Sequence, residues 1–220
     1  RSTTPESDVL HRTLSVMQER HIRTVAMEAS SHALVQHRVD GFHFSVAGFT
    51  NLSQDHLDFH GDMESYYQAK RSLFNGELSE FALINIDQEY GVRLASELSI
   101  PLGTLSIRNK KATWYFESIE SDSKGFNVVI RGEGGMLIEG RINLLGSYNL
   151  ENCLLAVAIA AYSGVDPLVI GQSLTTLTGA PGRLEKIVNG QEFTALVDFA
   201  HSPDAVKKVL RTARETTNSR

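Results

Sequence analysis

The chain has 220 residues, of which 41% are hydrophobic and 21% charged, as in ordinary globular proteins. Its formal net charge of −5 argues against a nucleic-acid or anionic-membrane partner, since both favour a basic surface. Cys153 is the only cysteine, which excludes an internal disulfide, and no apolar run approaches the roughly 20 residues that cross a bilayer. The first residues also lack signal-peptide form, so we expect a cytoplasmic protein without membrane insertion, with one full domain and part of another.

The first hundred residues alternate between helical and strand-like patterns. A polar start precedes a helix whose apolar positions include Leu10 and Leu14. Short buried strands are predicted at 24–28 (TVAME), 44–52 (FSVAGFTNL) and 82–87 (ALINID), with a helix at 63–74. Strands alternating with helices predict an α/β fold with a mostly parallel central sheet flanked by helices.

The pattern changes between residues 100 and 145. Four strand-like runs separated by Ser-, Asp- and Gly-rich turns predict an antiparallel, hairpin-rich section. An apolar helix follows at 148–163, and Asp166 with Pro167 begins another as N-cap and first residue. Residues 179–182 (GAPG) are the best candidate hinge. Beyond it, a strand at 193–200 and a helix at 203–217 resemble the first unit of a second domain, which gives domains at 1–179 and 180–220.

Lys70 is the most informative position. It falls on an apolar stripe of the predicted helix, which is formed at helical spacing by Met63, Tyr66, Tyr67, Leu73 and Phe74. A lysine on a buried face is costly unless it is paired or neutral, and burial would lower its pKa and free the amine to react. The alternative is a lysine at the edge of the stripe that extends its ammonium into solvent.

Two loops rich in carboxylates and imidazoles follow predicted strands. Residues 51–61 (NLSQDHLDFHG) come directly after one strand, and Glu28 with His32 follows another. Since ligands bind beyond the carboxyl ends of strands in open α/β sheets, both loops are expected at one crevice. A carboxylate with an imidazole is a plausible set of ligands for a divalent metal, although a solvated loop remains the alternative for either segment.

Three later segments could hold a nucleotide. Asn149 and Asn152 lie at the start of the apolar helix, where their amides could contact a base or ribose or serve as caps. Arg183 follows the hinge, where a guanidinium could reach phosphates. Asp198 and His201 end the last strand, and the same pair could instead cap the helix that follows.

Taken together, these segments resemble the Mur ligase family, in order and over nearly the whole chain. The matching pieces are residues 2–5 (STTP), 27–32 (MEASSH), 36–38 (QHR), 50–61 (TNLSQDHLDFHG), 67–70 (YQAK), 146–149 (GSYN) with Asn152, 182–183 (GR) and 198–204 (DFAHSPD). The resemblance implies a monomeric, ATP-dependent ligase of peptidoglycan synthesis. Such an enzyme adds a diamino acid, meso-diaminopimelate rather than L-lysine, to UDP-MurNAc-L-Ala-D-Glu through an acyl phosphate.

The resemblance also assigns roles to individual residues. Contacts to the UDP-MurNAc-dipeptide are expected from Thr3, Thr4, Ser30, Gln36 and Arg38. Magnesium is expected at Glu28, His56 and Lys70, with Lys70 carbamylated by carbon dioxide. Contacts to ATP are expected from Asn149, Asn152, Arg183, Asp198 and His201. The residues expected to act in catalysis are Lys70, His56 and Arg183.

The chain departs from the family pattern in what it lacks. It contains no G-x-x-G-K-[ST] phosphate loop, no uridine-binding domain and little of the third domain. The sequence therefore resembles an internal fragment that is inactive alone: most of a central ATP-binding domain and the start of a Rossmann-like C-terminal domain. A folylpolyglutamate synthase-like ligase, a metal-dependent hydrolase built on Glu28, His56, Asp58 and His60, and a non-catalytic scaffold are the competing interpretations.

Overall fold

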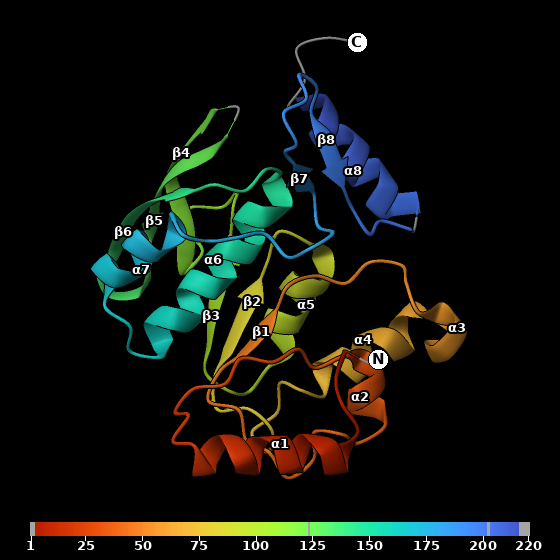
Figure 1. Cartoon of the computed structure of the whole chain (residues 1–220). Coiled ribbons are helices and arrows are strands. Elements are labelled where there is room, and N and C mark those ends of the chain that lie inside the picture. The colour runs from red at the N-terminus through yellow and green to blue at the C-terminus, as the bar shows by residue number, and fades with distance from the viewer. Residues whose placement is uncertain (1–2, 123, 202, 216–220) are drawn as a thin grey trace. The chain divides into compact units, whose positions relative to one another are not determined.

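The computed structural model describes residues 3–122, 124–201 and 203–215 of the chain (Figure 1). Ser2 and Ser202 of the predicted motifs, and positions 216–217 of the last predicted helix, lie outside the described residues. The chain forms two compact units, Arg1–Gly103 and Thr104–Arg220, called here the first and second units. The main sheet has the strand order β1-β2-β3-β4-β5-β6, and a second sheet pairs β7 with β8.

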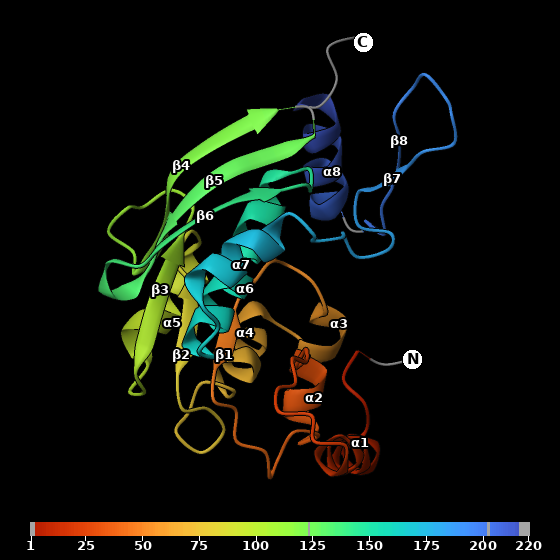
Figure 2. The ribbon, with the colours of Figure 1, turned by 60° about the vertical axis from the view of Figure 1, so that its left-hand side comes forward.

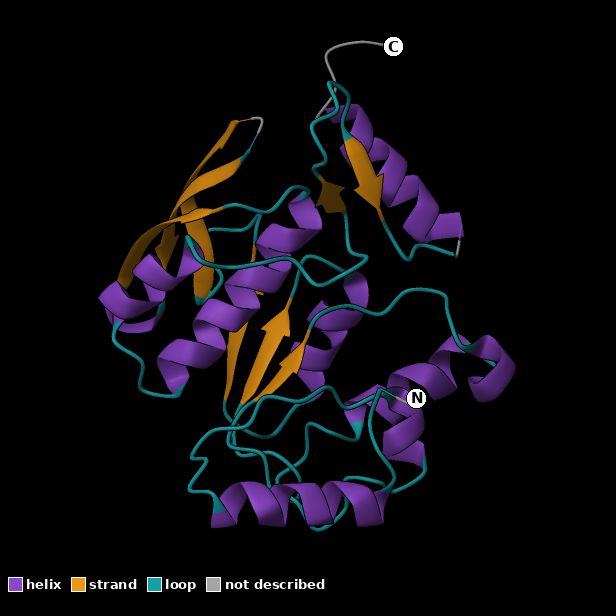
Figure 3. Cartoon of the chain, in the orientation of Figure 1, coloured by secondary structure: helices purple, strands orange, loops and turns teal. Residues whose placement is uncertain are grey.

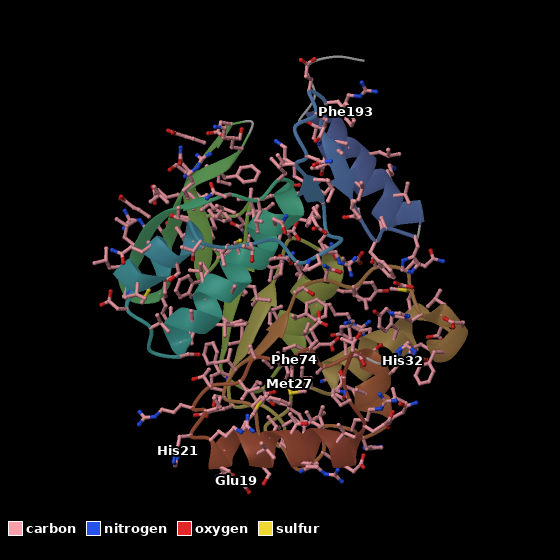
Figure 4. The ribbon with its side chains drawn as sticks, viewed as in Figure 1. Glu19, His21, Met27, His32, Phe74 and Phe193 are labelled. Atoms are coloured by element: carbon pink, nitrogen blue, oxygen red, sulfur yellow. The ribbon has the colours of Figure 1, made fainter. Side chains whose placement is uncertain are left out.

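The first unit opens with the predicted amphipathic helix, α1 (Ser7–Glu19). One apolar position of α1, Leu10, is buried in a small cluster with Leu34 and Val39. Leu34 belongs to α2 (Ser31–Val35), whose N-cap Ser30 accepts a hydrogen bond from the backbone of Ala33. Met27 packs against the same cluster (Figure 4). The N-terminal helices therefore cover a core of their own.

A second core lies around the parallel strands β1 (Ala47–Phe49) and β2 (Ala82–Asn85). Its apolar side chains come from both strands and from the helices α4 (Met63–Arg71) and α5 (Glu89–Glu97). Strand β2 is buried along its whole length, as expected for a strand covered on both faces. The two predicted strands and the helix at 63–74 are thus confirmed, with shorter bounds. A short helix, α3 (Leu57–His60), precedes α4.

The strand predicted at 24–28 is wrong. This segment is irregular, drawn as loop in Figure 3, and Val25 is 43% exposed. An extended segment becomes a strand only when a neighbour satisfies its backbone groups, and no strand of the described chain pairs with it. The apolar pattern of TVAME therefore predicted the conformation of a strand without supplying a partner.

The second unit carries the antiparallel section. Strands β4 (Trp114–Asp122), β5 (Gly125–Arg131) and β6 (Leu137–Ile142) pair antiparallel, with the short η1 (Glu133–Gly135) between the last two (Figure 2). The prediction fails for β3 (Leu102–Ser106), which pairs parallel with β4. Residues 107–113 form the loop between β3 and β4. At its start, the Ser106 hydroxyl accepts the backbone N–H groups of Arg108 and Asn109. Only the end of β3 pairs with the start of β4, Leu105 with Trp114 and Ser106 with Tyr115, so β4 continues in the direction of β3 and no hairpin forms.

Helices α6 (Ser147–Tyr162) and α7 (Pro167–Leu174) follow the antiparallel strands and confirm two predictions. Asp166 caps α7 by accepting the backbone N–H of Leu168 at 2.8 Å. Gly171 of α7 meets β6 so closely that a Cβ there would lie 2.3 Å from the Glu139 carbonyl oxygen. No helix in the described part of the chain is both long and apolar enough to cross a membrane.

The last elements are β7 (Glu185–Ile187), β8 (Ala195–Val197) and α8 (Pro203–Glu215). The predicted strand and helix are confirmed, whereas β7 was missed. Strand β7 has three exposed residues and no alternation of burial, so it carries little of the pattern by which strands are recognised. Several large apolar side chains are exposed here, such as Phe193 at 72% (Figure 4).

Candidate functional site

Thr4 ties the N-terminal segment to the loop that carries Glu28. Its side chain is fully buried, and its hydroxyl donates to the Glu28 carbonyl oxygen at 2.9 Å. The Thr4 hydroxyl oxygen also accepts the backbone N–H of Ser30 at 3.0 Å. Ser30 in turn caps α2, so one hydroxyl fixes the loop between residues 28 and 30 at the start of a helix. The predicted substrate residue Thr4 thus has its hydroxyl engaged within the protein.

Arg38 contacts the same N-terminal segment, and its side chain is only 14% exposed. Nη1 donates to the Thr4 carbonyl oxygen at 2.9 Å, and Nη2 contacts Glu6 Oε1 at 2.7 Å. The buried Nε has no hydrogen-bond partner among the described residues. The other two predicted substrate residues, Thr3 and Gln36, are exposed. Arg38 is therefore a partly satisfied cation whose Nε–H is unpaired among the described residues.

Three imidazoles lie close together, and we call His32, His56 and His60 the imidazole cluster (Figure 4 labels His32). The centroid of the His32 ring lies 5.0 Å from that of the His56 ring and 5.5 Å from that of the His60 ring. His60 stacks on Tyr66 at 4.7 Å, and its Nε2 lies 2.9 Å from the buried Ser31 hydroxyl. Burial lowers the pKa of His60, and His32, His56 and Lys70 lower it further. His60 is therefore held neutral.

Lys70 occupies the predicted position on α4 and is half-buried. Its Nζ lies 5.5 Å from the centroid of the Tyr66 ring. Burial lowers the pKa of Lys70, and the Glu28 carboxylate offsets part of this effect. The structure therefore brings Lys70 into electrostatic reach of Glu28, as both were expected to lie at one site. A lysine with a lowered pKa is more often neutral and nucleophilic than one in solvent.

The donor atoms here suit a hard divalent cation only in part. Among the residues that the structure describes, no three His, Cys, Asp or Glu side chains are arranged to hold a metal ion. Glu28 and His56 offer one carboxylate and one imidazole, and both are exposed. Magnesium prefers oxygen ligands and usually keeps some water and substrate oxygens, so two protein ligands with an added carboxylate would fit it.

A pocket of about 580 Å³ in the second unit holds two of the predicted nucleotide residues, Asn149 and Arg183. Asn149 donates to the Leu145 carbonyl oxygen at 2.7 Å, which fixes its amide and leaves Oδ1 as an acceptor. The pocket has an apolar part and a cationic part, lined respectively by Leu144, Leu145, Leu177 and Leu184, and by Lys124, Arg183 and Lys186. Its size is within the range of small-molecule sites.

The other predicted nucleotide residues do not line this pocket. Asp198 accepts the backbone N–H groups of Leu184 and Ala200, both at 2.8 Å, and so shapes the adjoining turn. His201 is exposed and lies against Phe199, with ring centroids 5.4 Å apart. Asn152 is exposed on α6. The structure thus joins Asn149 with Arg183 and leaves Asn152 and His201 at the surface.

The role of Tyr148 was not foreseen from the sequence. Its hydroxyl is buried without a hydrogen-bond partner among the described residues. Burial raises the pKa of Tyr148 to about 12, with a further contribution from Asp198. An aromatic residue at the start of a helix usually indicates packing, so no sequence pattern indicated this buried hydroxyl.

Comparison with known proteins shows the family of the chain. The family described as Mur ligase middle domain matches residues 1–160. A UDP-N-acetylmuramoyl-L-alanyl-D-glutamate–2,6-diaminopimelate ligase of Streptomyces coelicolor is 42% identical over 99% of the chain and 43% of its own length. The enzyme of the same name from Aquifex aeolicus is 39% identical, over 99% of the chain and 44% of its own length. The chain therefore spans less than half the length of these relatives.

Solved structures give the same fold. The structure of a UDP-N-acetylmuramoyl-L-alanyl-D-glutamate–2,6-diaminopimelate ligase has a TM-score of 0.81 at 31% identity, over 96% of this chain and 44% of that one. A folylpolyglutamate synthase of Mycobacterium tuberculosis has a TM-score of 0.63 at 20% identity, over 79% and 40%. At that identity the second likeness concerns the fold alone.

Proposed function

We propose, from the premise that this chain belongs to the Mur ligase family, that it forms part of a cytoplasmic, ATP-dependent ligase of peptidoglycan synthesis. The enzyme would join meso-diaminopimelate to UDP-MurNAc-L-Ala-D-Glu, the reaction named for relatives that are 42% and 39% identical. Residues 1–179 would belong to its central ATP-binding domain and residues 180–220 to the start of the C-terminal domain. We expect a monomer.

The observation that carries this proposal is the setting of Lys70. A half-buried amine with a lowered pKa, 5.5 Å from the centroid of the Tyr66 ring and within electrostatic reach of Glu28, is costly to keep unless its chemistry is used. In its neutral form the Nζ lone pair attacks the carbon of CO₂, an N–C bond forms, and one proton leaves to solvent. The lysine then ends in a carboxylate, which replaces the cation.

Glu28, His56 and the carbamylated Lys70 would together hold magnesium. When bound, the metal offsets the charge of the phosphoryl group that passes from ATP to the side-chain carboxylate of the D-glutamyl residue. The chain's own residues position the reactants. Thr4 fixes the loop of Glu28, and the Ser31–His60 hydrogen bond joins that region to α3. The amine of the diamino acid then attacks the acyl phosphate, and phosphate leaves.

The substrate residues fall into two groups. Thr3, Ser30, Gln36 and Arg38 would contact the UDP-MurNAc-dipeptide, whereas Thr4 would act through the backbone that it holds. Asn149 would contact the adenine base in the pocket, and Arg183 would contact phosphates as the catalytic cation of the second unit. Further contacts to the nucleotide would come from Asn152, Asp198 and His201.

The test is the mass of the intact protein, purified with bicarbonate, and the assignment of any adduct to a peptide. We expect one added CO₂ on Lys70, lost in Lys70→Ala together with ligation. Loss of one group that stabilises charge in a transition state lowers kcat by about 10²–10³-fold, and we expect a loss of at least this size. The control is Lys111→Ala, since Lys111 is exposed. An unmodified Lys70, with ligation intact in Lys70→Ala, would refute the proposed metal site.

A further inference from the structure

We propose that Glu6 occupies the place of a substrate carboxylate on Arg38, and that the substrate must displace Glu6 in order to bind. This inference rests on the proposed function, in which Arg38 contacts the dipeptide. Glu6 Oε1 lies 2.7 Å from Nη2 of Arg38. The Arg38 side chain is 14% exposed, whereas that of Glu6 is 63% exposed, so Glu6 is the more accessible partner of the pair.

Glu6 serves the local structure through its backbone, since its carbonyl oxygen accepts the Leu10 N–H at 2.9 Å. It is the N-cap residue of α1, yet its side chain makes no capping hydrogen bond. Short polar residues such as Ser, Thr, Asp and Asn are the ones that cap helices well. The Glu6 carboxylate is instead directed to Arg38, on a segment 32 residues away in sequence. The Glu6 side chain therefore contributes to the ion pair with Arg38 and not to the N-terminal cap of α1.

The donors of Arg38 indicate that a better acceptor than Glu6 exists. Nη1 is satisfied by the Thr4 carbonyl oxygen, whereas the buried Nε is unpaired among the described residues. Glu6 reaches Nη2 with one oxygen. A guanidinium binds a carboxylate most strongly through two parallel hydrogen bonds, so the present pairing leaves part of the binding capacity of Arg38 unused.

The substrate of the proposed reaction supplies the matching group. Its D-glutamyl residue has two carboxylates, of which only the side-chain carboxylate is phosphorylated. The other stays anionic through the reaction and requires a cation. Glu6 presents the same chemical group to the same guanidinium, so the two compete. A chain carboxylate that pairs with Arg38 also excludes other small anions until the correct substrate arrives.

The experiment compares steady-state kinetics of the intact enzyme with Glu6→Gln and Glu6→Ala. Because an exposed ion pair contributes little, the expected decrease in KM for UDP-MurNAc-L-Ala-D-Glu is about two- to fivefold, with kcat unchanged. The control is Asp8→Asn, which removes the same charge from the first turn of α1. Asp8 forms no ion pair among the described residues, so this variant should leave KM unchanged.

Arg38→Ala separates this inference from the proposed function. If Arg38→Ala raises KM and removes any effect of Glu6→Gln, competition at Arg38 is supported. If Arg38→Ala raises KM but both Glu6 variants raise KM or leave it unchanged, Glu6 orients Arg38 or does nothing, and the inference is overturned. If Arg38→Ala leaves KM unchanged, Arg38 does not contact the substrate, and the assignment of Arg38 fails together with the inference.

Discussion

Replacing Thr4 with valine should destabilise the first unit, because Thr4 joins two chain segments through one hydroxyl. Valine keeps the shape of the side chain but removes the donor to the Glu28 carbonyl and the acceptor for the Ser30 N–H. Thr4 is fully buried, so water cannot replace it from that side. A buried polar group left unpaired costs about 1–3 kcal/mol, and two partly buried groups give a loss of roughly 2 kcal/mol.

The assay is urea denaturation together with hydrogen exchange at the amide of Ser30. A loss of about 2 kcal/mol corresponds to roughly 30-fold faster exchange of that amide. Thr4→Ser keeps the hydroxyl and should lose only about 0.8 kcal/mol for the missing methyl group. The control is Thr13→Val, since the Thr13 hydroxyl bonds only to the Val9 carbonyl within the exposed face of α1.

Thr13→Val should change stability by less than about 0.5 kcal/mol. The reasoning is refuted if Thr4→Val stays within that range, or if Thr4→Ser is as unstable as Thr4→Val. The first result would mean that water satisfies the Glu28 and Ser30 backbone groups. The second would mean that the methyl group, and not the hydroxyl, joins the segments.

Three further predictions concern other parts of the chain. The folded pKa of His60 lies below its unfolded value of 6.5, so the unfolded chain binds more protons. The free energy of unfolding should therefore fall as the pH decreases below 6.5, until the folded pKa is reached. His60→Gln should remove this dependence in urea titrations at several pH values. Burial raises the pKa of Cys153 to about 11, so a thiol reagent at pH 8 should label it roughly 100-fold more slowly than in urea. Gly146→Ala should cost about 1–2 kcal/mol in thermal unfolding, since φ is +90° and the new Cβ would lie 2.8 Å from the Tyr148 ring.

The sequence predicted best what depends on neighbouring residues. The helices α1, α4, α6 and α7 follow from apolar spacing and caps, both of which are local signals. The placement of Lys70 on the apolar stripe follows from the same periodicity, and its half-buried position confirms it. The strands β1 and β2 also follow, because each forms a short buried run.

The sequence could not predict contacts between distant segments. The strand at 24–28 failed because a strand requires a partner, which spacing cannot supply. The sequence grouped His60 with Asp58 as possible metal ligands, whereas the fold directs His60 to Ser31, which is 29 residues away. The Glu6–Arg38 pair is equally remote. Such contacts depend on how α1 and α2 pack, which no local pattern records.

The backbone conformation at His56 should affect which residue a library screen enriches at this position. His56 has φ 54° and ψ 24°, a left-handed conformation in which glycine is favoured by about 1 kcal/mol over residues with a Cβ. The Asp55 carboxylate helps to hold it by accepting the His56 N–H at 2.9 Å. A library screened only for thermal stability should therefore enrich glycine at position 56. A library screened for ligation should retain histidine, so the two screens would diverge at this single site.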